Sequence, residues 1–92
     1  MNVKGLKDIC GQEFVAEIIS DNGSTFTIKN PIYFVPVEQG MMPVPYLMTT
    51  KSEVKINKSS LVLDPFDVVD NISNTYKQMF GGIVEPPNGI IV

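Results

Sequence analysis

The chain contains no His, no Trp and no Arg, so all seven of its basic residues are Lys. A catalytic triad that uses His and a zinc site with His ligands are therefore excluded, as is a bidentate Arg clamp on a carboxylate or phosphate. No nucleophile with a paired base can be named. We therefore predict no enzymatic activity, no catalytic residues, no metal and no cofactor.

Cysteine and long apolar runs are also scarce. Cys10 is the single cysteine, so it cannot form an internal disulfide, and it is typical of a small half-buried hydrophobic residue more than of a reactive thiol. No stretch reaches the ~18 apolar residues of a membrane helix, and Met1–Cys10 lacks the apolar centre of a signal peptide. We expect a cytoplasmic protein with no membrane partner.

Length and charge set two further limits. With 92 residues the chain forms one domain with a modest core, which favours additional stabilisation by self-association. The net charge of −3 argues against strong non-specific binding to a phosphate backbone. Any contact with nucleic acid must therefore be local.

Alternating apolar residues predict a mainly β fold. Phe26 and Ile28 would share one strand face, and Asp21–Ser24 contains the Asn-Gly pair that hairpin turns favour. Asn30 and Pro31 interrupt an otherwise β-prone run, which predicts a bend within one long strand. The predicted strands are near 13–20, 24–37, 42–49, 53–56 and 61–63.

Two segments near these strands carry special signals. Val3–Ile9 fits a strand or a short helical turn, and we favour the strand. Prolines at alternate positions, Pro43 and Pro45, predict an edge strand because neither residue has an N–H to donate. Val37–Gly40 is typical of the turn that precedes this strand.

The C-terminal third predicts one amphipathic helix over about 65–80. Asp64 suits the N-cap, Pro65 the first helical position and Gly81 the C-terminal end. We expect the helix to cover a sheet face or close a barrel end. Its apolar stripe consists of Val69, Ile72, Tyr76, Met79 and Phe80.

The last segment, 82–92, is an apolar tail with a Pro-Pro-Asn-Gly turn in its middle. Because an apolar end is rarely left in water, we expect it to dock on the protein or on a neighbouring subunit.

Several segments together resemble one family. The chain is similar to the Sm-like (LSm-type) proteins of marine cyanobacterial phages, and the residues that carry the likeness are Gly11–Ile18, Thr27–Pro31, Val54–Ser59 and Asn74–Gly81. The resemblance implies a single Sm-like domain: a strongly bent five-stranded antiparallel barrel over about 11–63, followed by the helix and the tail. If the protein is encoded by a phage, the cytoplasm is that of the infected bacterial host.

The resemblance also implies an assembly and a ligand. Sm-like subunits pair edge strand to edge strand into a closed ring, here of five to seven subunits, and ring-forming relatives bind single-stranded RNA around the pore. Such pairing would remove open sheet edges that otherwise promote aggregation. The implied function is RNA or single-stranded DNA binding, with a role in nucleic-acid processing or regulation.

Candidate nucleic-acid-binding residues follow from the same resemblance. The family places polar and stacking residues between the second and third strands and a basic-Gly motif between the fourth and fifth, where this chain has Asn57-Lys58-Ser59 with no Gly. Lys51, Lys55 and Lys58 would form a basic band around a ring. The candidates are Asn57, Lys58, Lys55, Lys29, Asn30 and Tyr46, with Tyr33 as a further stacking residue.

Each candidate also has a structural interpretation. The lysines fit an ordinary solvated strand face, and the tyrosines fit core or interface packing. Asp64, Asp67 and Asp70 resemble a metal cluster, but compensation of the helix dipole explains them better. The alternative function is a structural or adaptor phage protein whose ring binds other proteins through the apolar tail and the turn that contains Met41, Met42 and Met48.

Overall fold

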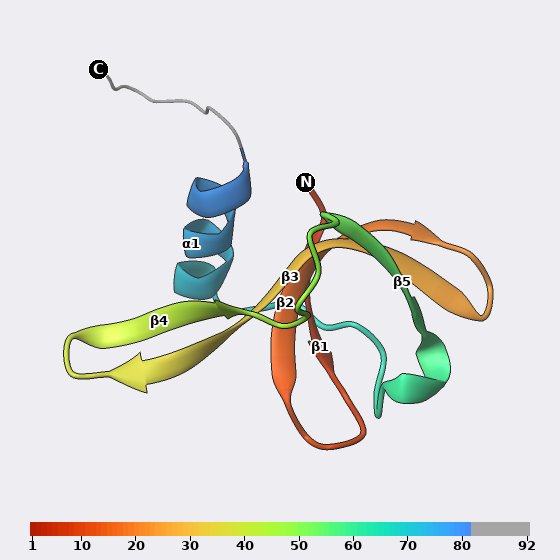
Figure 1. Ribbon diagram of the computed structural model, residues 1–92, viewed down its shortest axis with the longest axis horizontal. Helices are drawn as coiled ribbons and strands as arrows, with labels where there is room; N and C mark the ends of the chain where they lie inside the picture. The colour runs from red at the N-terminus through yellow and green to blue at the C-terminus, as the bar shows by residue number, and fades with distance from the viewer. Residues whose placement is uncertain (82–92) are drawn as a thin grey trace.

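The computed structural model describes residues 1–81, and the tail predicted over 82–92 lies outside this part. The described chain is mainly β, with five antiparallel strands in one sheet and a single C-terminal helix, as predicted (Figure 1). The elements are β1 (Val3–Lys7), β2 (Glu13–Asp21), β3 (Thr25–Val37), β4 (Gly40–Pro45), β5 (Glu53–Asn57), the 3-10 helix η1 (Lys58–Ser60) and α1 (Asp70–Phe80).

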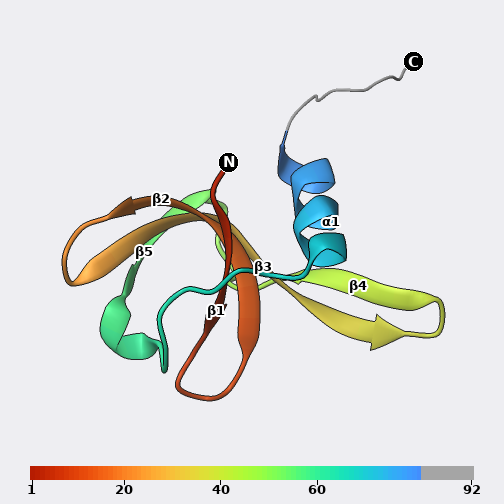
Figure 2. The same cartoon turned by 180° about the vertical axis from the view of Figure 1, so that it is seen from behind.

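The long strand β3 organises the sheet. The hydrogen-bonded order is β1-β2-β3-β4, and β5 also pairs with β3. The first half of β3, Thr25–Lys29, lies against β5, whereas the second half, Ile32–Val37, lies against β4. The β3–β4 hairpin therefore extends from the body as a two-stranded arm (Figures 1 and 2).

The predicted bend at Asn30 and Pro31 is confirmed, and it is a bulge. Between the pairs Val15↔Ile32 and Glu17↔Lys29, β3 advances three residues while β2 advances two. Asn30 takes a positive φ of 49°, which its short polar side chain tolerates better than a β-branched residue would. The extra residue moves the even-numbered side chains of β3 from one sheet face to the other.

The two sheet faces support two apolar clusters. The inner cluster contains Leu6, Phe14, Ala16, Phe26 and Ile28, all buried. On the opposite face α1 packs over the sheet, as predicted, and buries the outer cluster of Val15, Ile32 and Tyr76.

Tyr76 joins α1 to the bulge. Its ring is fully buried, and its hydroxyl accepts a hydrogen bond from the Glu17 N–H at 3.0 Å. The same hydroxyl donates towards two carbonyl oxygens, that of Lys29 at 2.6 Å and that of Asn30 at 3.0 Å. One side chain thus satisfies backbone groups that the bulge removes from the strand ladder.

The predicted start of the helix is wrong. α1 begins at Asp70, its N-cap is Val69, and Asp64 does not cap it. Phe66 instead pairs with Gly5 of β1 through two backbone hydrogen bonds of 2.7 and 3.0 Å, which hold this segment extended. Gly5 is required there because a Cβ would lie 2.3 Å from the Phe66 ring.

Other boundaries also differ from the prediction. The strand over Val3–Lys7 is confirmed, so the sheet begins before residue 11. The edge strand covers Gly40–Pro45 and not 42–49, and 61–63 contains only an isolated bridge between Leu61 and Asp8. Cys10 was predicted to be half-buried, but it is exposed.

The predicted helix stripe is also too wide. Ile72, Tyr76 and Phe80 pack in the outer cluster, whereas Val69 and Met79 are 67% and 43% exposed. Val69 precedes the helix, so the helical spacing does not apply to it.

Candidate nucleic-acid interface

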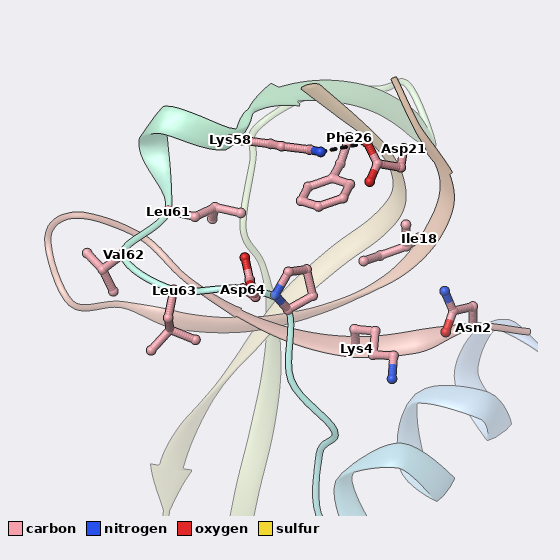
Figure 3. A pocket seen from close by; sticks show the side chains of 11 residues that line it. Asn2, Lys4, Ile18, Asp21, Phe26, Lys58, Leu61, Val62, Leu63 and Asp64 are labelled. Carbon is pink, nitrogen blue, oxygen red and sulfur yellow. Dashed lines mark hydrogen bonds and ion pairs between the residues drawn. The ribbon is translucent and has the colours of Figure 1, made fainter. Parts of the chain in front are cut away.

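The β2–β3 turn and η1 meet at one end of the sheet, although they are far apart in sequence. The Lys58 ammonium lies 2.6 Å from a carboxylate oxygen of Asp21 (Figure 3). The Lys58 backbone N–H donates to the Ser24 carbonyl oxygen at 2.9 Å. We refer to Asp21–Ser24 together with Asn57–Ser60 as the turn site.

The Lys58 side chain has a fixed position in this site. Its ammonium lies 4.6 Å from the centroid of the Phe26 ring, an arrangement that favours the cation electrostatically. The hydrogen bond from Lys58 holds the pKa of Asp21 below its usual range, and a backbone hydrogen bond from Gly23 acts in the same direction. Lys58 is therefore oriented by Asp21 and Phe26, and its charge is partly compensated.

Polar groups surround the pair. Asn22 closes the turn by donating its N–H to the Thr25 carbonyl oxygen at 2.8 Å, and its side-chain amide donates to the Thr27 hydroxyl oxygen at 2.9 Å. Asn57, a predicted candidate, is exposed immediately before η1, and its carbonyl oxygen accepts a hydrogen bond from the Ser60 hydroxyl at 2.7 Å. The turn site is thus a polar surface with one central cation.

A hollow of about 660 Å³ opens beside the turn site, between β2 and the chain that follows η1 (Figure 3). Its apolar side is formed by Ile18, Phe26 and Leu61, whereas Asp21, Lys58 and Asp64 supply charge. Phe26 is only 8% exposed and its ring faces the Lys58 ammonium, so the accessible part of this side consists mainly of the aliphatic side chains Ile18 and Leu61.

Lys55 and Lys29 lie on the outward face of β5 and β3, away from this hollow. Lys55 pairs with Thr27 across the ladder and helps line a shallow depression with Lys51. Lys29 stands between two carboxylate residues, since Glu17 and Glu53 are its partners on either side. Opposite charges at such cross-strand positions attract each other.

Asn30 and Tyr46 have structural contacts. Asn30 forms the bulge, and its N–H donates to the Ser52 carbonyl oxygen at 2.8 Å. The Tyr46 ring stacks on Phe14, with centroids 3.8 Å apart, and its hydroxyl donates to Asp8 at 2.6 Å. Burial, together with this hydrogen bond, raises the pKa of Tyr46 to about 12. Tyr33 packs against the inner cluster.

Sequence reasoning missed Asp21, Asn22 and Ser24 as candidates. With the strands numbered from residue 13, Asp21–Ser24 lies between the first and second strands, so Asn30 and Tyr33 were chosen as the nearest polar and stacking residues for the loop that the family uses. With β1 included, that loop is Asp21–Ser24. The available signals were the strand pattern of Val3–Ile9 and the Asn-Gly turn.

The carboxylates before α1 do not gather into a ligand set. Asp67 binds the Lys4 ammonium, which lowers the pKa of Asp67, and Asp70 lies in the first turn of α1. Within residues 1–81, no group of three or more His, Cys, Asp or Glu side chains is placed to hold a metal ion. In the same part of the chain, no helix has the length and apolar character needed to cross a membrane.

No protein-family model matches the chain, and no curated protein matches it.

Proposed function

We propose that this chain is a non-enzymatic Sm-like protein that forms a homo-oligomeric ring and binds single-stranded RNA or DNA at the turn site. The observation that carries the proposal is the contact between Asp21 and Lys58. It brings the polar loop between the second and third strands against the basic turn at Lys58. This turn follows β5, whereas the family resemblance places the basic motif between the fourth and fifth strands.

Two features of the fold support the Sm-like part of the proposal. β3 is long and bent, as a small barrel requires, and the segment after η1 returns to β1 through the bridges of Leu61 and Phe66. A cyanophage origin stays a prediction.

The ring requires open sheet edges, and β5 supplies one. Backbone hydrogen bonds of Lys58 with Ser24 and of Ser52 with Asn30 lie at the two ends of the β3–β5 ladder. Because hydrogen-bonded positions alternate along an antiparallel strand, the backbone groups of Glu53, Lys55 and Asn57 point away from β3. These groups are available for pairing with a neighbouring subunit. A ring of five to seven subunits is the assembly that the resemblance implies.

Binding is tested by fluorescence anisotropy with A-rich, U-rich and single-stranded DNA oligomers across a salt series, with the mass measured by light scattering. We expect Lys58→Ala to weaken binding and to lower the slope of log affinity against log salt by about 0.7. Asp21→Asn frees the ammonium of Lys58 and is expected to strengthen binding.

Lys77→Ala is the matched control, because Lys77 is exposed on α1 and loses the same charge. If Lys58→Ala and Lys77→Ala weakened binding equally, the binding would depend only on the net charge of the protein, and the turn site would be refuted. If the protein assembles into a ring but binds none of the oligonucleotides at low salt, the nucleic-acid function itself is refuted.

A second candidate function is a structural or adaptor protein that binds other proteins. The β3–β4 arm favours it, since Glu38 is the only charged residue between Pro31 and Met48. Met41, Met42 and Met48 are 56%, 48% and fully exposed. Exposed apolar surface of this kind is typical of protein interaction sites.

A further inference from the structure

A second hollow, distinct from the one at the turn site, lies between the β3–β4 arm and the start of α1. It has a volume of about 360 Å³. Most of its lining is apolar and comes from β2, from the arm, from the connection before α1 and from the start of α1, and Glu13 and Asp67 add two carboxylates at its wall. The apolar side chains that matter here are Phe34, Met41, Phe66, Val68, Val69 and Ile72. We call it the arm groove.

The arm groove continues the outer cluster into solvent. Phe34, Val68 and Ile72 already pack against the buried members of that cluster. The next side chains outward, Val69 and Met41, are 67% and 56% exposed. An apolar occupant would therefore extend an existing core, and each buried CH₂ group would gain about 0.8 kcal/mol of transfer free energy.

The chain itself supplies apolar residues close by. Beyond Gly81, at the end of α1, residues 82–92 lie outside the described part. Their sequence contains five Ile or Val residues and one charge, Glu85. A tethered segment of this composition meets the groove at a high effective concentration, which an unlinked partner lacks.

The tether is long enough. From Ile72 to Gly81 the helix rises about 14 Å. The eight residues 82–89 reach about 26 Å when extended, which exceeds this rise. Ile90 and Ile91 can therefore return to the level of Ile72.

We propose that the segment Ile90–Val92 docks in the arm groove of its own subunit and covers Val69 and Met41. The docked segment would join the arm to α1, which residues 1–81 leave separated by the groove. This interaction is independent of the turn site, because the two hollows share no residue.

A second copy of the arm is a weaker occupant. A hairpin with six-residue strands presents a face of roughly 20 by 10 Å, whereas a stable interface buries about 800 Å² on each partner. The arm alone therefore offers too little surface for a stable dimer.

The single cysteine makes a direct test possible. Cys10 is exposed in the β1–β2 turn, and its near neighbours Gln12 and Glu13 line the arm groove. A nitroxide attached to Cys10 of the full chain, with isotope-labelled Ile methyl groups, should cause loss of the Ile90 and Ile91 methyl signals. Retention of both signals would overturn the proposal.

Two further samples complete the test. Val69→Asp should restore the Ile90 and Ile91 signals, whereas Val62→Asp, at a similarly exposed valine outside the groove, should not. In a mixture of spin-labelled chains without isotope and isotope-labelled Cys10→Ser chains, the signals should persist. Their loss in that mixture would place the segment in the groove of another copy and overturn docking within one subunit.

Discussion

The two halves of β3 have opposite surroundings. Thr25–Lys29 lies between β2 and β5, with Phe26 and Ile28 buried on one face and Lys29 among carboxylates on the other. Ile32–Val37 pairs with β4 along its length and meets β2 only at Ile32, and its end is exposed, with Val37 at 44%. One strand therefore serves as the centre of a sheet and as one side of a two-stranded arm.

The difference shows where the arm obtains its stability. A two-stranded ribbon is marginal in water, so the second half of β3 needs contacts outside its own ladder. Phe34 packs towards α1, and the residue after β4, Tyr46, stacks on Phe14 in the inner cluster. The first half needs no such support because it has neighbours on both sides.

The largest expected effect comes from the side chain that joins the two halves. Tyr76→Ala removes a buried ring and should lower the free energy of unfolding by about 3–5 kcal/mol. Tyr76→Phe keeps the ring but leaves the Glu17 N–H and the carbonyl oxygen at the bulge unpaired, which costs about 1–3 kcal/mol. Urea unfolding of both variants measures this. An unchanged Tyr76→Phe variant would show that water replaces the hydroxyl.

Tyr76 also predicts a response to alkali. Burial raises the pKa of Tyr76 to about 12, above its ordinary value near 10. The folded state therefore prefers the neutral phenol, and the resulting stability is present below pH ~10 and is lost as the pH rises towards 12. Tyr76→Phe should reduce the decrease in unfolding free energy between pH 8 and 11; an equal decrease in both proteins would assign it to other groups.

The bulge itself gives a smaller effect. Asn30→Val places a β-branched residue at a positive φ and should cost about 1–3 kcal/mol, whereas Asn30→Gly should be close to neutral. Thermal unfolding of the two variants compares them directly. If both lost the same stability, the Asn30 side chain and not its backbone conformation would be responsible.

Acid should weaken the attachment of the arm to the inner cluster. Hydrogen bonds from the Tyr46 hydroxyl and from the backbone N–H groups of Gln12 and Cys10 hold the pKa of Asp8 below its usual range. This carboxylate therefore stabilises the fold above pH ~4 and stops doing so as the pH falls further. Asp8→Asn should lose less stability than the natural chain between pH 6 and 3 in urea unfolding, with Asp64→Asn as the control for charge.

The smallest effect on stability concerns the outer edge of β4. The Tyr46 N–H donates to the Pro31 carbonyl oxygen, so the backbone groups of every second residue, Met41, Pro43 and Pro45, point away from β3. On this outer edge the two prolines offer no N–H for pairing. Replacing Pro43 and Pro45 by Thr should increase association through this edge, measured by light scattering. Val44→Thr is the control, since its N–H already faces β3. Equal mass in all three proteins would contradict edge protection.

Much of the fold could be predicted from local patterns. The Asn-Gly hairpin, the bend at Asn30 and Pro31, and the shared strand face of Phe26 and Ile28 are confirmed, because turn chemistry and alternation are properties of neighbouring residues. The start of the helix could not be predicted, because Asp64 and Pro65 form a good helix start in isolation. The Gly5 pairing of Phe66 overrides that local preference.

The candidate site was predicted in part. Lys58 and Asn57 lie in the turn site, whereas Asn30 and Tyr46 are occupied by backbone and core contacts. Asp21 was not selected, because its relation to Lys58 is a contact across 37 positions of sequence. No periodicity within either segment reports such a contact.

The sequence by itself determined the chemistry that this protein lacks, the β character of its first two thirds, and the protected edge of β4, since these depend on residue types and short spacings. Only the tertiary structure decided which charges are compensated, which face α1 covers, and that Asp21 and Lys58 share one site. The physical reason is that these properties depend on distances between segments that are far apart in sequence. The pairing of β5 with β3 brings Lys58 to Asp21, and the pairing of Phe66 with Gly5 anchors the chain before α1.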